Sequence, residues 1–251
     1  MYEKTKNLIC KKNIGIIKFI LIAVLLGVFV FSAIQLCKYI SDIQENKKVK
    51  NELSDHIAIN DFESESKIDV DFKTLKEKNS DTVAFLRVKG TDIEYVVVKG
   101  EDNNYYLSHN FDGNPNRAGW VFADYRNKLD GSDKNIVVYG HNMKDGSMFA
   151  TLKNVLEPEW QDDEKNLYID FVTENEKSTY QVFSVYQIET EDYYNMTEFL
   201  NNISYEKFLD KLKSRSNKDF NVQITSRDRI LTLSTCANNA NNRIVLHAKK
   251  I

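Results

Sequence analysis

A thiol, an imidazole and a guanidinium stand at the ends of predicted strands in this chain of 251 residues. Cys236 ends the run TLSTC, Arg243 opens the run RIVLHAKK, and His141 follows the run NIVVYG. A thiolate is a nucleophile, and a nearby imidazole can accept and return its proton. A fixed guanidinium can stabilise the oxyanion that forms when the thiolate attacks an amide carbonyl. If these strand ends converge at one rim of a barrel, the three side chains can transfer an acyl group through a thioester.

Each of these side chains also has a plainer interpretation. His141 is one of four histidines and could lie on the surface, Arg243 could form an ion pair, and Cys236 could be a small buried hydrophobe. The other two cysteines, Cys10 and Cys37, flank an apolar segment near the N-terminus. Cys236 therefore has no disulfide partner in the rest of the chain, and it is either buried and inert or reactive. Taken together, the three strand-end residues favour the catalytic interpretation.

The apolar segment at residues 19–37, FILIAVLLGVFVFSAIQLC, carries no charge. As a helix it is about 28 Å long, close to the hydrocarbon thickness of a bilayer. Five lysines precede it against one acid, Glu3: Lys4, Lys6, Lys11, Lys12 and Lys18. This bias predicts a cytoplasmic N-terminus with the rest of the chain outside. A cleaved signal peptide or a lipoprotein cysteine at Cys37 are the alternatives. The run lacks an A-x-A-like site, and bulky Leu36 precedes Cys37, so an uncleaved signal anchor is favoured.

Charge and composition exclude some classes of function. Residues 1–40 hold six lysines and one glutamate, a net charge of +5, whereas the whole chain carries −3, which leaves −8 for residues 41–251. An acidic exported domain repels phosphates, so we expect no nucleic-acid partner. No His, Cys and acid cluster at ligand spacing is evident, and we expect no metal and no cofactor. Asp124, Asp130 and Asp133 could bind calcium, but a solvated loop is the favoured interpretation.

The rest of the pattern predicts a mainly β domain. Residues 38–80 are polar with scattered apolar positions, which indicates a stalk with one or two short helices. About eight strand-like runs follow, at 83–88, 93–98, 119–124, 135–140, 167–171, 179–188, 229–235 and 243–250. Few helices alternate with them, so a closed antiparallel barrel is favoured over a parallel βαβ fold. Helices are expected at 204–215, with Ser204 as N-cap, and around 147–156, with Met148, Phe149, Leu152 and Leu156 on one face.

At this point the motifs resemble a known family. TLSTC followed by Arg243, with YGHNM upstream, resembles the sortases of Gram-positive bacteria over about 83–251. FADYRN (122–127), YGHNMKDGSMF (139–149) and the late helix resemble class B in particular, although Val96 stands where a proline is common. The resemblance implies a sortase-type closed barrel of about eight strands with added helices, preceded by one transmembrane helix. The expected parts are a cytoplasmic tail (1–18), the anchor (19–37), the stalk and N-terminal helices (38–80) and the sortase catalytic domain (81–251).

The resemblance also implies the reaction. A sortase cleaves a C-terminal sorting signal of a secreted protein, NPxTN-like or PxTG-like, after its threonine, and passes the acyl group to an amine of peptidoglycan or its lipid-linked precursor. By motif match, Cys236 is the nucleophile, His141 the general acid/base, and Arg243 the oxyanion or substrate-positioning residue. The expected partners are thus secreted proteins with such a signal, the wall amine, and the membrane through residues 19–37.

Substrate-binding residues follow from the same resemblance. They are Tyr139, Ser234, Asn103, Leu107, Thr190 and Tyr194. The loop ANNANN (237–242) is shorter and less acidic than class B members often have, which bears on the preferred signal. Two alternatives to the sortase interpretation are an L,D-transpeptidase or other cell-wall cysteine peptidase, and a non-catalytic anchored barrel that binds wall or host ligands. The L,D-enzymes usually place a glycine directly before the cysteine, where this chain has Thr235.

Overall fold

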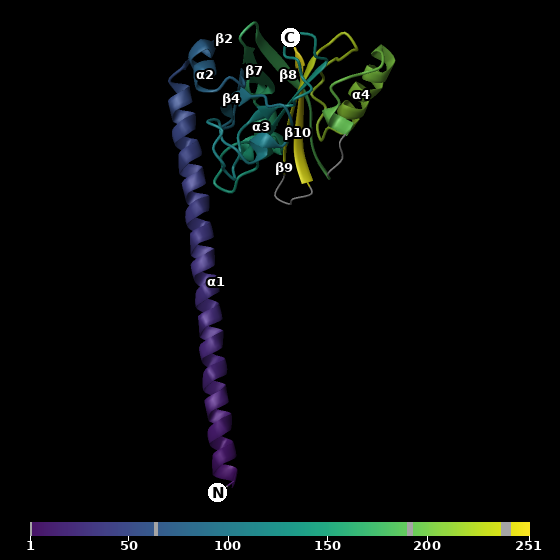
Figure 1. Cartoon of the computed structure of the whole chain (residues 1–251). Coiled ribbons are helices and arrows are strands. Elements are labelled where there is room, and N and C mark those ends of the chain that lie inside the picture. Colours follow the sequence, from purple (N-terminus) through teal and green to yellow (C-terminus); the bar gives the residue numbers. More distant parts are fainter. Residues whose placement is uncertain (1, 63–64, 190–192, 237–241) are drawn as a thin grey trace. The chain divides into compact units, whose positions relative to one another are not determined.

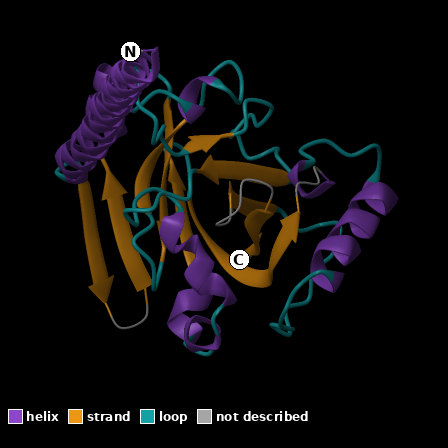
Figure 2. Ribbon diagram, turned by 90° about the horizontal axis from the view of Figure 1, so that it is seen from below, coloured by secondary structure: helices purple, strands orange, loops and turns teal. Residues whose placement is uncertain are grey.

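A closed barrel of eight strands forms the centre of the protein (Figures 1 and 2). The computed structural model describes residues 2–62, 65–189, 193–236 and 242–251. The strand order around the barrel is β10-β8-β7-β3-β4-β5-β6-β9, and β9 pairs with β10 to close it. The strands are β3 (Thr82–Val88), β4 (Glu94–Val98), β5 (Phe122–Ala123), β6 (Asn135–Gly140), β7 (Tyr168–Thr173), β8 (Lys177–Glu189), β9 (Ile230–Cys236) and β10 (Asn242–Lys250). The predicted mainly β barrel is confirmed.

Two of the strand pairs are parallel, so the closed barrel is mixed, whereas the strand pattern favoured an antiparallel one. β4 runs parallel to β5, and β6 runs parallel to β9. The chain between β6 and β9 contains β7, β8 and the late helix, so it returns to the starting end of the barrel before β9 begins. Alternation of apolar and polar residues marks a strand but carries no information about the direction of its neighbour.

Alternation along β9 separates the core from a polar outer face. Leu231 and Leu233 are fully buried in the main core, together with Val138 of β6 and Leu246 of β10. The alternate residues of β9, Thr232 and Ser234, point to the other side of the sheet and are buried as well. The outer face is therefore covered by protein and must satisfy the hydrogen bonds of its polar groups internally.

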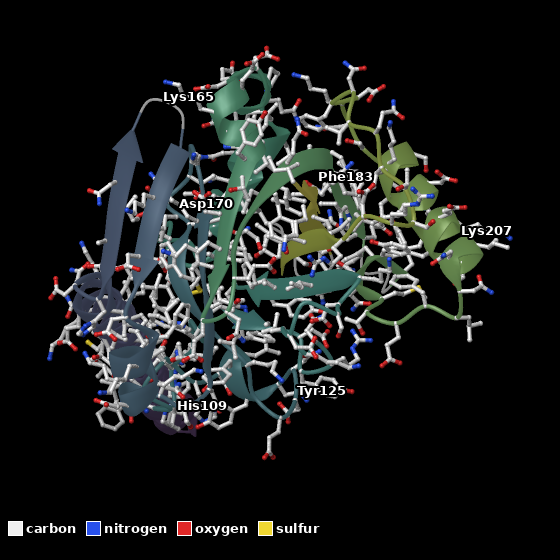
Figure 3. All side chains as sticks on the ribbon, turned by 90° about the horizontal axis from the view of Figure 1, so that it is seen from above. His109, Tyr125, Lys165, Asp170, Phe183 and Lys207 are labelled. Carbon is white, nitrogen blue, oxygen red and sulfur yellow. The ribbon has the colours of Figure 1, made fainter. Side chains whose placement is uncertain are left out.

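The late helix, α4 (Asn202–Ser214), supplies part of that cover. Its apolar stripe packs with Phe183 and Tyr186 of β8 and Val245 of β10, and Figure 3 shows Phe183 on the side of the barrel that faces α4. The stripe consists of Tyr205, Phe208, Leu209 and Leu212. The expected N-cap at Ser204 is wrong. Asn201 is the N-cap, and Ser204 is the N3 residue that completes a capping box with it.

The expected helix at 147–156 is a 3₁₀ helix, η2, that begins only at Ala150 and ends at Leu156. Gly146 and Met148 have φ values of +89° and +55°, which a right-handed helix cannot contain. The remaining short elements are η1 (Tyr105–Leu107), α3 (Pro158–Gln161), η3 (Glu164–Leu167) and η4 (Tyr193–Asn195).

The N-terminal region contains a hairpin that the sequence did not predict. After α1 (Tyr2–Ser54) come β1 (Ile57–Phe62), β2 (Glu65–Val70) and α2 (Phe72–Lys78). Ile68 and Phe72 pack on Phe85 and Val172 of the barrel, on the flank away from α4 (Figure 2). Residues 45–251 form one compact unit and residues 1–44 another. The later part of the expected stalk thus packs with the barrel, because the apolar face of the hairpin covers β3 and β7. That face consists of Ile57, Ile59, Ile68 and Val70.

Within the described residues, one helix is long and apolar enough to cross a membrane. It is the part of α1 from Lys18 onward, and the large apolar side chains between Phe19 and Leu36 are exposed. Side chains of this kind are stable in contact with lipid and costly in contact with water.

A buried histidine lies on the outer face of β10, near α4. The His247 ring is fully buried, with Nδ1 2.9 Å from the Thr232 hydroxyl and Nε2 2.9 Å from the Tyr186 hydroxyl. Tyr193 of η4 donates in turn to the Tyr186 oxygen at 3.3 Å. Burial lowers the pKa of His247 from 6.5 to about 3, so the ring is neutral in the folded protein.

We expect acid to destabilise the barrel through His247. Below pH 6.5 the unfolded chain takes up a proton on this histidine and the folded chain does not, so the free energy of unfolding falls by about 1.4 kcal/mol for each pH unit. Urea unfolding of fragment 45–251 at pH 7.5 and pH 5.0 measures the loss, about 2 kcal/mol from this group. His247→Gln is expected to be less stable at pH 7.5 yet to lose less stability on acidification. An equal loss in both proteins would refute this account.

Candidate active site

Strand register brings the three strand-end residues to one level of the barrel. β9 lies between β6 and β10, with Gly140 opposite Thr235 in the parallel pair and Cys236 opposite Arg243 in the antiparallel pair. His141 directly follows Gly140 and thus lies beside Cys236 along the sheet. The side chain of Cys236 lies outside the described part of the structure, whereas its position at the end of β9 is described.

A pocket of about 310 Å³ opens at this level. His141 and Arg243 line it, together with five of the six residues predicted to bind substrate: Asn103, Leu107, Tyr139, Tyr194 and Ser234. The sixth, Thr190, lies outside the described residues, as does most of the ANNANN loop. Sequence reasoning missed Phe122 and Asn195, which also line the pocket. Phe122 opens the FADYRN motif and Asn195 follows Tyr194, so adjacency to predicted positions was the available signal.

Hydrogen bonds to two loops hold His141 in place. Its Nε2 lies 2.9 Å from the carbonyl oxygen of Leu107, and its own carbonyl accepts from the backbone N–H of Phe149 at 2.9 Å. A carbonyl can only accept, so Nε2 carries the proton of the neutral ring and Nδ1 carries the free lone pair. Nδ1 is therefore the atom that can exchange a proton with a neighbouring group.

Two glycines allow the close approaches around His141. A Cβ at Gly140 would lie 2.6 Å from the ring of buried Phe149. Gly119 has a φ of +57°, and a Cβ there would lie 2.3 Å from the carbonyl oxygen of Tyr106, next to the backbone that binds His141. Larger residues at either position would force the histidine or its partner to move.

Arg243 presents an unused donor. Its side chain is partly buried, and its Nε has no hydrogen-bond partner among the described residues. A buried guanidinium N–H without a partner is costly, and an oxygen of a bound ligand would satisfy it.

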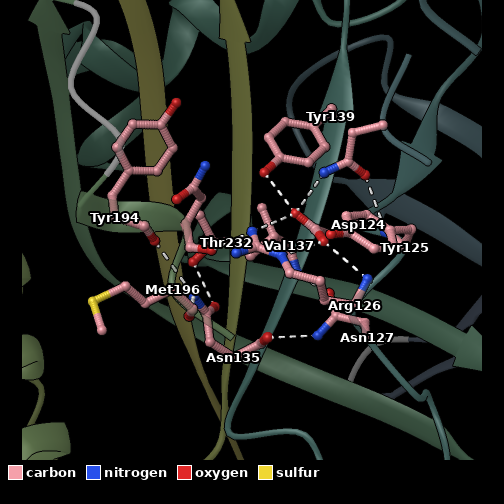
Figure 4. Close-up of polar contacts among 12 residues, drawn as sticks. Asp124, Tyr125, Arg126, Asn127, Asn135, Val137, Tyr139, Tyr194, Met196 and Thr232 are labelled. Atoms are coloured by element: carbon pink, nitrogen blue, oxygen red, sulfur yellow. Dashed lines mark hydrogen bonds and ion pairs between the residues drawn. The ribbon is translucent and has the colours of Figure 1, made fainter. Parts of the chain in front are cut away.

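A buried carboxylate, Asp124, lies behind the pocket and contacts two of its lining residues, Asn103 and Tyr139 (Figure 4). It is fully buried and accepts hydrogen bonds from Asn103 Nδ2 at 3.0 Å and from the Tyr139 hydroxyl at 2.9 Å. The Arg126 guanidinium binds both of its oxygens, at 2.8 and 2.7 Å. Burial by itself raises the pKa of Asp124. The hydrogen bonds from Arg126 and Tyr139 and the positive charge of Arg126 outweigh burial and hold the pKa below its usual value.

The expected solvated acidic loop is wrong for two of its three members. Asp124 and Asp133 are buried, and only Asp130 is exposed. Asp133 accepts hydrogen bonds from the backbone N–H groups of Lys128 and Leu129 and from Asn127. Asp133 is thus occupied by N–H donors of its own loop, and Asp124 by the donors described above, which is why both carboxylates tolerate burial.

Comparison with known proteins identifies the family. The family model described as Sortase domain matches residues 86–251. The chain belongs to the sortase family. Sortase B of Listeria monocytogenes is 37% identical over 85% of this chain and 87% of its own length. Sortase B of Staphylococcus aureus is 34% identical over 92% of this chain and 94% of its own. A crystal structure of sortase B from Bacillus anthracis, in complex with AAEK1, has a TM-score of 0.74 and 33% identity over 84% of this chain and 99% of that chain.

These matches confirm the class B resemblance and make the chain a sortase cysteine transpeptidase. They favour this assignment over the alternatives of an L,D-transpeptidase and a non-catalytic binding barrel. In this sortase barrel, the pocket beside Cys236 is the candidate active site.

Gly140→Ala tests the close packing beneath His141. The added methyl group meets the Phe149 ring, so we expect a loss of about 1–3 kcal/mol in stability and a displaced histidine. A shift of this kind is expected to lower kcat on the order of 100-fold. Steady-state peptide cleavage measures kcat, and Phe149→Leu in the same chain makes room for the methyl group and should restore part of it. Wild-type kcat in Gly140→Ala would show that the contact does not set the position of His141.

Proposed function

We propose that this protein is a membrane-anchored transpeptidase that cleaves a C-terminal sorting signal, NPxTN-like or PxTG-like, through a Cys236 thioester. The acyl group then passes to an amine of peptidoglycan or its lipid-linked precursor. The strand register supports this most, since Cys236 pairs with Arg243 while its neighbour Thr235 pairs with Gly140, the residue before His141. His141 and Arg243 both line the pocket.

The first half of the reaction forms the thioester. The Cys236 thiolate attacks the carbonyl carbon of the signal threonine, and the carbonyl oxygen takes up negative charge. Arg243 donates to that oxygen or to a neighbouring peptide oxygen, and its unused Nε supports this role. The C–N bond then breaks, and the His141 imidazolium gives the Nδ1 proton to the leaving amine. The Leu107 carbonyl accepts a hydrogen bond from the Nε2–H of the ring and so stabilises the imidazolium.

The second half releases the product. An amine of the wall precursor attacks the thioester carbonyl, neutral His141 accepts a proton from that amine through Nδ1, and the thiolate leaves. The new amide joins the secreted protein to the wall, and Cys236 and His141 return to their starting protonation states. Water in place of the amine would give hydrolysis.

The N-terminal helix supports a location at the membrane. Its exposed apolar side chains suit lipid, and the lysines that precede them favour a cytoplasmic N-terminus. The catalytic domain would then lie on the outer surface, where secreted proteins and wall precursors meet.

Cleavage of a peptide library by the full chain in detergent micelles tests the function. We expect release of the fragment that follows threonine in a sorting-signal peptide, and a mass shift on Cys236 equal to the acyl fragment. Cys236→Ala should abolish both while keeping the wild-type circular dichroism spectrum. Continued turnover by Cys236→Ala would remove the thiol from the mechanism, and cleavage of no sorting-signal peptide by the wild type would refute the proposed substrate class.

The role of Arg243 has a separate test. Arg243→Gln removes the charge and the fork of donors, and we expect kcat to fall by about 100-fold or more. Arg227→Gln is the matched control, because Arg227 is exposed and precedes β9 at the end away from Cys236. Near-normal kcat/KM in Arg243→Gln would exclude the oxyanion role.

A further inference from the structure

The FADYRN motif contains a charged group that the proposed chemistry does not use. Asp124 is fully buried behind the pocket, yet it is not among the residues that line the pocket. Its carboxylate accepts from Asn103, from Tyr139, and from the backbone and side chain of Arg126 (Figure 4). A buried carboxylate is stable only where hydrogen-bond donors such as these are held around it.

The donors come from segments far apart in the sequence. Asn103 precedes η1, and Tyr139 belongs to β6. Arg126 binds the carboxylate and also donates from Nη2 to the carbonyl oxygen of Asn195, in η4, at 2.9 Å. Asn103, Tyr139 and Asn195 all line the pocket, so one carboxylate connects three parts of its wall.

The carboxylate also decides which groups the wall presents. Asn103 Oδ1 accepts from the backbone N–H of Tyr125 at 3.0 Å, and one N–H of its Nδ2 goes to Asp124. The amide is thereby held at both ends, which leaves its second N–H as the donor for a peptide carbonyl. The Tyr139 hydroxyl donates its hydrogen bond to Asp124, so toward the pocket its oxygen can only accept one.

We propose that Asp124 is a positioning residue for peptide capture, holding Asn103, Tyr139 and, through Arg126, the backbone at Asn195 in the geometry that binds the sorting signal. This role rests on the proposed function, since it concerns the same pocket. Asp124 does not touch the reacting atoms, so its loss affects binding of the peptide rather than the chemical step.

Asp133 provides a matched control. It is a buried carboxylate nine residues later. It accepts hydrogen bonds from Asn127, Lys128 and Leu129, which lie in its own loop and not in the pocket lining. Asp124→Asn and Asp133→Asn thus make the same chemical change at two buried sites. Only the first disturbs the wall.

The experiment measures cleavage of the preferred sorting-signal peptide by the full chain in detergent micelles. We expect Asp124→Asn to raise KM by about tenfold, the value of one good hydrogen bond, with kcat within threefold of wild type. The alkylation rate of Cys236 by iodoacetamide should not change. Asp133→Asn should lower the unfolding midpoint without changing KM. An unchanged KM in Asp124→Asn, or a fall in kcat alone, would overturn the proposal.

Two further measurements keep the result decisive. If Asp124→Asn does not fold, Arg126→Met provides a second test. Arg126 is exposed, and its loss removes the link to Asn195 and should raise KM at least threefold; no change in KM would overturn the proposal.

Hydrogen exchange does not depend on turnover: Asp124→Asn should speed exchange in 101–107 and 193–196, and Asp133→Asn should not. If the wild type cleaves no peptide but this exchange pattern holds, the proposed function fails and the positioning role stands. An unchanged pattern would overturn the role.

Discussion

The parallel pairing of β6 with β9 is the contact on which the site depends. It sets Gly140 opposite Thr235 and thereby places the histidine beside the cysteine, while the antiparallel pairing of β9 with β10 adds the arginine. A slip of one residue would exchange the two faces of β9, turning Leu231 and Leu233 out of the core and burying Thr232 and Ser234 inside it. The hydrophobic core thus enforces the register of the three strand-end residues.

Hydrogen-bonded polar groups, rather than apolar packing alone, shape the outer face of these strands. The hydroxyls of Tyr194 and Ser234 are hydrogen-bonded at 2.9 Å. Asn135 donates to the carbonyl of Met196 at 2.9 Å (Figure 4). Asn135 also accepts from Thr232, which in turn contacts His247. Such a network has few alternative arrangements, because each broken bond leaves a buried group unsatisfied. Residues 194–196 are therefore held firmly where they border the pocket.

The sequence was sufficient to predict the strands and the family, and insufficient for the features that depend on how strands pair. Each barrel strand has a clear apolar run, and the residues around Cys236, His141 and Arg243 carry a specific motif. The direction of neighbouring strands was missed because a strand shows the same alternation of apolar and polar residues whether its neighbour is parallel or antiparallel. The hairpin at 57–70 was missed because its apolar alternation is short, with two apolar positions on each strand that face the barrel. Asp124 was taken for a loop acid because its partners Asn103 and Tyr139 are 21 and 15 positions away, and no local pattern reveals them.

The order of the strands along the chain has a consequence for biogenesis. β9 is the seventh barrel strand to be synthesised, yet it inserts between β6 and β10, and its partners on β6 are 95 positions earlier, as for Asn135 and Ile230. Contacts of such large sequence separation form late and slowly. A nascent chain whose last strands are still unpaired therefore holds His141 without Cys236 beside it. The three strand-end residues come together only when β9 has paired with β6 and β10 and the barrel has closed.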